Sequence, residues 1–487
     1  MAQFVKLDTE KLTVLRQIDE RLVSYNVEMT EVAGGTFWKA YTEAQIDGTE
    51  EFPWIDDWRD KSKLQQWYDP IDTKNPRLLK LAKELGSAWI RVSGTWANKT
   101  YYDFDGHCNG VVPEGFQSLL TKEQWLNLLD FVKDVNGKLL VSIANCPGIH
   151  SAHEPITFEQ ADLLFRTSKE YGVPISAAEF TNEPDLMDIS GVPDGYTTAD
   201  HARDHDLFGA WLRENYPECL FVGPCATAPH APEEPMNENS VEALLGDYKS
   251  KMDVFSDHHY DGISERGAAM GGHWPYEACM SEKYLSLAAE VAKLYVPYRD
   301  RYVPGGQLWV TESGDAACGG NTWASTYADV LRTLNELDGF CTVTDGIIFH
   351  NTLAASDYGW LKSGTYDPRP NYFAVLLWTR LMGNTVYDSK IPVSEGAHVY
   401  CHCRKDGKPG FAYLVINNSQ TAITTVELPK EAVCYTLAGR DGLRSRVMTL
   451  NGCDLVLGEN DKLPDLSGRA ASGTMELTPG TSAFFVL

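Results

Sequence analysis

The chain has 487 residues, of which 43% are hydrophobic and 23% are charged, and its formal net charge is −26. This length exceeds a single ordinary core and suits a barrel of about 250 to 400 residues with a smaller second domain. The acidic excess repels nucleic acid, anionic membranes and highly sulfated polymers, and no run of Lys or Arg offers a compensating basic groove.

The first residues lack the charged start and apolar core of a signal peptide, and no stretch approaches the about 18 consecutive apolar residues of a membrane span. Eleven cysteines in such a chain favour reduced thiols, so we expect a cytoplasmic protein. Cys401-His402-Cys403 has C-x-C spacing without a second pair of ligands nearby. We therefore expect neither a metal site nor another cofactor.

Three segments precede the first clear helix. Residues 3–8 predict a lone strand, and residues 22–28 predict a stronger one that ends in polar residues before Gly34-Gly35. The segment 41–70 is rich in Trp, Asp and Pro and has weak periodicity. It predicts a long loop over the site or a short helical excursion.

From residue 75 onward, helices and strands alternate. The helix predicted at 75–86 has a proline near its start, leucines at helical spacing and a glycine at its end, and a strand at 88–93 follows it. The same order continues to residue 382, with further strands expected at 138–145, 175–180, 220–224, 254–260, 307–313 and 346–351. Counted from residue 22, eight strands that each precede a helix predict a (β/α)8 barrel.

After about residue 388 the helical periodicity disappears, and short strands separated by turn signals predict an antiparallel β-sandwich. The strand at 3–8 is expected to join this sandwich, because it would protect an exposed sheet edge. We therefore expect a barrel domain at 17–388 and a β-sandwich domain formed by 1–16 and 389–487.

Two of the apolar strands lead to a glutamate. The fourth strand leads to Asn182-Glu183-Pro184, and the seventh ends at Glu312. The carboxyl ends of these strands face each other across the mouth of an eight-stranded barrel. Two carboxylates at one bond are the apparatus of glycoside hydrolysis, in which one protonates the leaving oxygen and the other attacks the anomeric carbon or activates water. We expect Glu183 to be the acid/base and Glu312 the nucleophile.

The residues around this pair have predicted roles. Asn182 is expected to bind the sugar 2-hydroxyl, and Glu179 to point inward but deeper as a buried acid, because it shares the facing parity of Glu183. Glu183 needs a raised pKa, whereas Glu312 needs hydrogen-bond donors that keep it ionised. Adjacent strand residues point to opposite faces, so one of His258 and His259 is expected to face inward and bind substrate or orient Glu312.

In combination, the strand ends at 138–145, 178–184, 254–260 and 311–320 resemble those of the heparanase and β-glucuronidase family, glycoside hydrolase family 79. So does the segment at 367–383, and the resemblance runs in order from about residue 20 to 390. It implies a retaining mechanism with Glu183 and Glu312 in the roles given above and a C-terminal β-sandwich. It also implies sugar contacts from Thr95, Asn182, His259 and Tyr260, with either Asn26 or Glu28 near the far hydroxyls.

One stretch departs from the family pattern. Members that bind glucuronic acid tend to carry a tyrosine followed by glycines shortly after the nucleophile, where hydroxyl and N–H groups hold the substrate carboxylate. Here the tyrosine is absent and Ala317-Cys318 precede Gly319 and Gly320, whose amides could form an anion nest.

These observations predict an exo-β-glucuronidase that releases a terminal sugar from a glycoside or oligosaccharide. The alternative within the same class is a β-glycosidase for a neutral sugar such as a galactoside or xyloside. The alternative of another class is a non-catalytic carbohydrate-binding barrel protein, which the two strand-end acids disfavour. An endo-enzyme that cleaves heparan would need a basic cleft, which the net charge disfavours.

Overall fold

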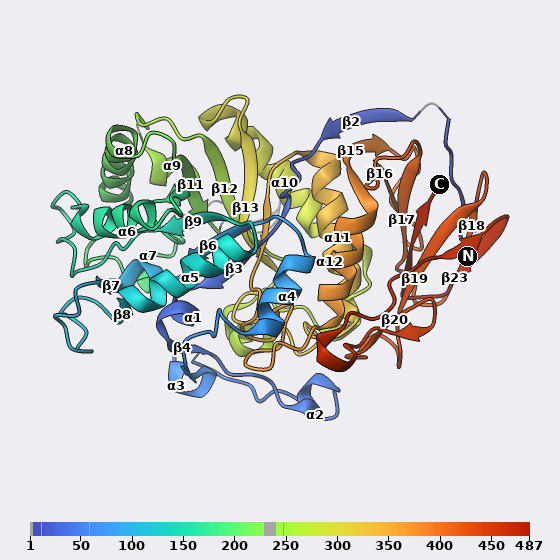
Figure 1. Ribbon diagram of the computed structural model, residues 1–487, viewed down its shortest axis with the longest axis horizontal. Helices are drawn as coiled ribbons and strands as arrows, with labels where there is room; N and C mark the ends of the chain where they lie inside the picture. The colour runs from blue at the N-terminus through green and yellow to red at the C-terminus, as the bar shows by residue number, and fades with distance from the viewer. Residues whose placement is uncertain (1–2, 11, 58, 228–239, 247) are drawn as a thin grey trace.

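The computed structural model describes residues 3–10, 12–57, 59–227, 240–246 and 248–487, and Figure 1 shows a barrel beside antiparallel sheets. Eight parallel strands close the barrel in the order β3-β6-β9-β10-β11-β12-β13-β14. Their bounds are Val23–Glu28, Trp89–Ser93, Lys138–Ser142, Ile175–Glu179, Leu220–Ala226, Val254–Tyr260, Gln307–Gly314 and Ile348–His350. This ring confirms the predicted barrel.

A main helix follows each barrel strand along the chain. These helices are α4 (Pro76–Glu84), α5 (Lys122–Asp134), α6 (Glu159–Glu170), α8 (Thr198–Asn215), α9 (Val241–Leu245), α10 (Glu282–Tyr302), α11 (Ala328–Val343) and α12 (Pro370–Leu381). Their starts follow from local capping. The Asn75 side chain accepts the first free N–H groups of α4, and Thr121 and Gln124 form a capping box at α5.

Large apolar side chains close the amino-terminal end of the barrel. Trp89 and Trp309 pack with their ring centroids 4.9 Å apart, and Leu140, Ala177, Val222, Val254, Ile347 and Phe349 complete this buried cluster. The carboxyl ends of the strands and the loops that follow them are therefore left to build a cavity, as in other barrels of this type.

Residues 382–487 and the N-terminal strands form two mostly antiparallel sheets, seen beside α11 and α12 in Figure 1. The larger sheet contains β2 (Thr13–Gln17), β15 (Met382–Asp388), β16 (His398–Arg404), β17 (Phe411–Asn417), β24 (Thr481–Val486), β19 (Ala432–Gly439), β20 (Met448–Leu450), β21 (Cys453–Asp454) and β22 (Arg469–Ala471). The smaller one contains β1 (Gln3–Lys6), β18 (Thr424–Glu427) and β23 (Thr474–Leu477).

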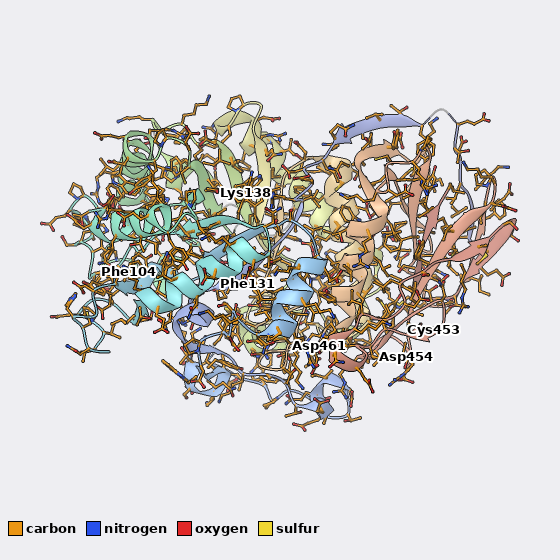
Figure 2. All side chains as sticks on the ribbon, viewed as in Figure 1. Phe104, Phe131, Lys138, Cys453, Asp454 and Asp461 are labelled. Carbon is orange, nitrogen blue, oxygen red and sulfur yellow. The ribbon has the colours of Figure 1, made fainter. Side chains whose placement is uncertain are left out.

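The N-terminal strand does join these sheets, as predicted. β1 pairs with β18 in parallel, and β2 pairs with β15, so the chain start and the chain end are woven together. Arg77 at the start of α4 also donates to Asp461, labelled in Figure 2, at 2.7 Å. The domain bounds 17–388 and 1–16 with 389–487 stay a prediction.

The segment between the first two barrel strands is more ordered than a loop. α1 (Met29–Ala33) follows β3, and β4 (Gly35–Trp38) pairs with β5 (Gln65–Tyr68) across short helices α2 (Glu43–Ile46) and α3 (Lys61–Leu64). Two further short strands, β7 (Thr100–Asp103) and β8 (Ser118–Thr121), follow β6, and α7 (Met187–Ser190) follows β10. Among the described helices, none combines the length and the apolar character that a membrane span requires.

Candidate active site

The two predicted glutamates line one cavity of about 1200 Å³ at the carboxyl ends of the barrel strands. Glu183 follows β10, and Glu312 lies within β13 near its end. One carboxylate oxygen of each, together with a ring nitrogen of His258, lies within a set of three atoms no more than 4.8 Å apart. The barrel therefore brings residues 129 positions apart in the sequence to one point, as their strand positions predicted.

The backbone of Glu183 has a conformation that few non-glycine residues adopt. Its φ is 47°, in the left-handed region, which costs free energy and persists only where the surrounding structure enforces it. The His258 Nδ1 atom lies 3.0 Å from Glu183 Oε1, and the Glu183 side chain keeps 16% of its surface exposed. This acid is thus oriented by a histidine and still open to the cavity.

Glu312 is more enclosed and is surrounded by donors. Arg91 Nη1 donates to Oε1 at 2.9 Å, and the Tyr260 hydroxyl donates to Oε2 at 2.8 Å. Burial alone would raise the pKa of Glu312, but His258, Arg91 and the Tyr260 hydrogen bond outweigh it, and the net pKa is lowered. The carboxylate is therefore ionised, which is the state that a nucleophile requires.

Arg91, which the sequence did not single out, connects the residues of the site. It lies in β6, is fully buried, and pairs with Glu179 at 2.9 Å as well as with Glu312. Glu179 is buried below the cavity, as its parity predicted. An unpaired buried charge is costly. Glu179 is a second counter-ion for Arg91, so Glu312 is not the only carboxylate that balances its charge.

Asn182 lines the cavity beside Glu183. Its Oδ1 atom accepts a hydrogen bond from Arg91 Nη2 at 2.8 Å. With the oxygen engaged in this way, the amide nitrogen of Asn182 is the group that can donate to a substrate hydroxyl.

The prediction that His259 contacts the sugar is wrong, because His258 is the inward histidine. Side chains alternate regularly along β12: Val254 belongs to the cluster inside the barrel, His258 and Tyr260 line the cavity, and Asp257 and His259 face α10 and α11. His259 Nε2 instead lies 2.8 Å from Asp261 Oδ1 and does not line the cavity. Tyr260 lines the cavity as predicted.

The structure separates the two candidates on the first strand. Asn26 lies below the cavity and donates to the Thr311 carbonyl at 3.1 Å, whereas Glu28 lines the cavity together with Thr95. Glu28 Oε2 is buried without a hydrogen-bond partner. Burial, and then the charge of Glu312, raise the pKa of Glu28 well above its usual value.

Gly319 and Gly320 do not line the cavity, so the expected anion nest is not presented to it. Both have positive φ and pack closely, Gly319 against Trp38 and Gly320 against Tyr358, where a Cβ atom would clash. Their carbonyls are held by neighbouring loops: Ser356 donates to Gly319 and Tyr41 donates to Gly320. These glycines therefore serve close packing behind the cavity wall.

Two further residues of the site were missed. Asn351, just after β14, donates to the Tyr260 hydroxyl at 2.8 Å and to the Tyr358 hydroxyl at 3.1 Å, and both Asn351 and Tyr358 line the cavity. The sequence signal for Asn351 was the polar pair His350-Asn351 at the end of the eighth strand. Asn351 orients the tyrosine that holds Glu312.

Four basic side chains also line the cavity, and no run of Lys or Arg in the sequence predicted them. They are Arg59, Lys61, Lys99 and Lys283. Burial, and then its neighbour Lys61, lower the pKa of Lys99. Three segments far apart in the chain carry these side chains, so only the fold brings them to one cavity, whose lining also contains acidic residues such as Glu28 and Asp188. Glu183, His258 and Glu312 are also positioned to hold a metal ion.

Comparisons with known proteins found relatives that are similar over most of this chain. No family model matches the chain. It is 25% identical to heparanase-like protein 1 of Arabidopsis thaliana over 86% of this chain and 85% of that protein. It is also 25% identical to hyaluronoglucuronidase of Hirudo nipponia over 86% and 90% of the two chains. A 32% match to baicalin-β-D-glucuronidase of Scutellaria baicalensis covers 33% of this chain and 31% of that protein.

Solved structures show the same fold. A 4-O-α-L-rhamnosyl-β-D-glucuronidase from Fusarium oxysporum 12S superposes with a TM-score of 0.64 at 14% identity over 99% of this chain and 100% of that one. An α-L-arabinofuranosidase from Thermotoga maritima gives 0.61 at 13% identity over 100% and 99%. The relatives and the site together confirm a glycoside hydrolase whose substrate is a carbohydrate.

Proposed function

We propose that the chain is a retaining β-glycosidase of the heparanase and β-glucuronidase family, glycoside hydrolase family 79, to whose members it is similar over most of its length. The observation that carries the proposal is the approach of the Glu183 and Glu312 carboxylates, whose nearest oxygens lie within 4.8 Å. Retaining enzymes hold their two carboxyl groups about 5–5.5 Å apart and inverting enzymes about 6.5–9.5 Å apart, and a close approach of single oxygens supports the shorter separation without measuring it.

The environments of the two acids assign their roles. Glu312, kept ionised by Arg91 and Tyr260, attacks the anomeric carbon and forms a glycosyl-enzyme ester. Glu183, more exposed and next to His258, donates a proton to the leaving oxygen in this step. It then takes a proton from the water that hydrolyses the ester, which returns both carboxyls to their starting state.

The sugar that we propose is a terminal uronic acid, released by an exo-acting β-glucuronidase. Two relatives are named for glucuronide cleavage. Lys61 and Lys99 line the cavity, as does Cys318 in the stretch where the family tyrosine is absent. In this proposal Lys61, which lies in another loop, attracts the substrate carboxylate in place of the missing tyrosine.

One observation favours the alternative of a neutral sugar. Glu28 lines the cavity with a buried oxygen that has no hydrogen-bond partner, and a carboxyl group there suits sugar hydroxyls. If Glu28 ionised, its charge would repel a uronate. A β-galactoside or β-xyloside is therefore the second candidate.

Hydrolysis of a panel of 4-nitrophenyl β-glycosides distinguishes these readings. The glucuronide is expected to be the best substrate, and Lys61→Met and Lys99→Met are expected to raise its KM without raising that of the xyloside. Turnover of the galactoside or xyloside alone would favour the neutral sugar. No turnover of any member by the wild type, with Glu183→Gln and Glu312→Gln indistinguishable from it, would contradict the enzyme itself.

A further inference from the structure

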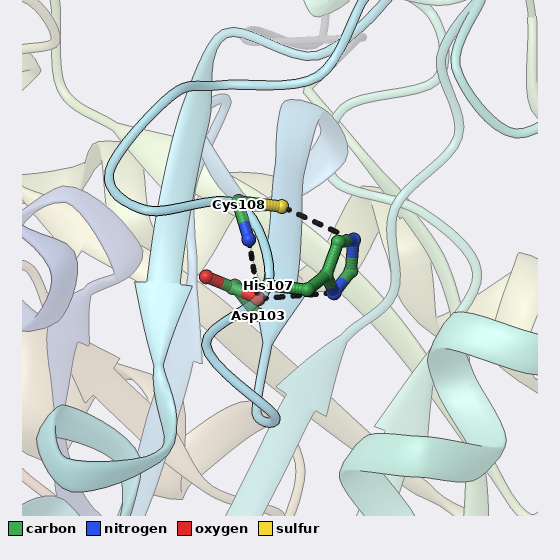
Figure 3. A group of neighbouring side chains, drawn as sticks. All are labelled: Asp103, His107 and Cys108. Atoms are coloured by element: carbon green, nitrogen blue, oxygen red, sulfur yellow. Dashed lines mark hydrogen bonds and ion pairs between the residues drawn. The ribbon is translucent and has the colours of Figure 1, made fainter.

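A second group of metal-ligand side chains lies outside the catalytic pair, where β7 ends and its loop begins (Figure 3). One oxygen of Asp103, one ring nitrogen of His107 and the Cys108 sulfur lie within 4.8 Å of one another. We propose that this group, here called the loop cluster, is a binding site for a borderline-soft divalent cation such as Zn²⁺. This proposal is independent of the proposed function.

The two ring nitrogens of the histidine in the loop cluster have different partners. Asp105 Oδ1 pairs with His107 Nδ1, and Asp103 Oδ1 lies 3.4 Å from the same nitrogen, whereas His107 Nε2 lies 3.4 Å from Cys108 Sγ. A carboxylate on one ring nitrogen fixes the proton there and leaves the lone pair of the other for a metal. Zinc bonds of about 2.0–2.1 Å to nitrogen and about 2.3 Å to sulfur place tetrahedral ligands about 3.5 Å apart, close to the separation seen here.

The charge of the loop favours a cation. Residues 103–108 contain two acidic side chains, Asp103 and Asp105, and no Lys or Arg. A coordinating thiol loses its proton outright, so Cys108 would bind a cation as a thiolate.

The donor set and the access both fit zinc. Thiolate sulfur, imidazole nitrogen and carboxylate oxygen are its usual ligands, and three protein ligands leave a fourth position for water. Asp103 is 4% exposed and His107 is 58% exposed, so the cluster has a fixed inner ligand and an open path from solvent.

The loop cluster lies on a segment whose two ends line the cavity. Lys99 and Gln117 both line it, and the Gln117 N–H donates to the Lys99 carbonyl at 2.9 Å, which closes the base of the segment. A cation that joins the end of β7 to the turn after it would hold this segment in one conformation. Its expected contribution is to stability and to the order of the cavity rim.

Calorimetric titration of the metal-free full chain with Zn²⁺ tests the proposal. The wild type and the control Cys453→Ser, which changes an exposed cysteine labelled in Figure 2, are expected to bind one ion alike. Cys108→Ser and His107→Ala are expected to lose this binding. Asp105→Asn, which keeps every ligand, is expected to weaken it about 10–100-fold.

The catalytic cluster is a second place for a cation, so the titrations are repeated in a Glu312→Gln background. Binding at the loop cluster is expected to survive that change, and Co²⁺ bound there is expected to show a thiolate charge-transfer band that Cys108→Ser alone removes. Equal Zn²⁺ affinity in wild type and Cys108→Ser, or a cobalt spectrum without the thiolate band, would overturn the proposal. Thermal unfolding checks that each variant is folded. If Cys108→Ser and His107→Ala do not fold, the Zn²⁺ affinity of Asp105→Asn decides the proposal.

Discussion

Two adjacent histidines of β12 belong to two networks made of the same kinds of residue. The inner network, Arg91, Glu179, Glu183, His258 and Glu312, faces a cavity of about 1200 Å³. The outer network, His259, Asp261, Asp329, Arg332 and Glu336, is buried between the barrel and α11, and Asp261 is its one member that lines the large cavity. Beside His259 and Glu336 there is a void of only about 10 Å³.

Each network places a buried arginine among carboxylates, and both are held by ion pairs. What differs is access, since only the inner network leaves two carboxylates in reach of a substrate-sized space. Buried charge on its own therefore indicates a costly polar network, and a cavity is needed to turn it into a site.

The largest expected difference between the networks is in kcat after one carboxylate is removed from each. Glu312→Gln is expected to lower kcat by at least the roughly 10²–10⁴-fold that acid–base groups contribute, because no other group can form the ester. The matched change Glu336→Gln in the outer network is expected to leave kcat of the folded enzyme near the wild-type value. Steady-state kinetics on an aryl glycoside measures both, with circular dichroism as the folding control.

Removing the outer arginine should reverse the pattern. Arg332→Met leaves Asp329 and Glu336 buried without their partner, which is expected to cost about 3–5 kcal/mol of unfolding free energy. Urea denaturation measures this loss, and kcat of the fraction that remains folded should be unchanged. A stable variant with reduced kcat would show that the outer network also serves catalysis.

The two histidines should differ in pH dependence. Burial raises the pKa of Glu312 and the His258 charge is the largest opposing influence, so His258→Gln is expected to raise that pKa. Ionised Glu312 is needed for attack, and the acid limb of the kcat profile should therefore move to higher pH. His259→Gln should leave the limb in place, and an equal shift in both variants would remove the distinction between the networks.

The smallest effect is expected at Asp257, which immediately precedes the two histidines in the sequence. Burial raises its pKa to about 7, with His259 and His258 opposing. A raised carboxyl pKa gives stability that is full below the ordinary value of 3.8 and is lost as pH rises through about 7. Asp257→Asn should flatten the decline of Tm across this range, and an unaltered decline would place its cause elsewhere.

Strand order was enough to predict the barrel and to place Glu183 and Glu312, because each follows an apolar run with a helix on either side. Facing parity was right for Glu179 on β10, and on β12 it correctly allowed only one of the two histidines to face inward. The family resemblance implied His259, but His258 shares a face with Tyr260 and lines the cavity.

Features that depend on several distant loops could not be predicted. Lys61 and Lys99 meet because the segments after β3 and β6 converge on one cavity, and no short-range pattern reports that. Gly319 was read as an anion nest because of its position after the nucleophile, but the packing of Trp38 against it decides its role. Arg91 is the one charged residue of an apolar strand, and its role is clear only from its partners in the structure, Glu179 and Glu312.

Trapping the covalent intermediate tests the central claim most directly. A 2-deoxy-2-fluoro-β-glycoside of the sugar preferred in the substrate panel should accumulate as a glycosyl-enzyme, because the fluorine slows its hydrolysis more than its formation. Peptide mass spectrometry is predicted to find the label on Glu312, with Glu312→Gln unlabelled. A label on Glu183, or rapid turnover to an inverted sugar with no labelled peptide, would contradict the assignment of Glu312 as the nucleophile of a retaining enzyme.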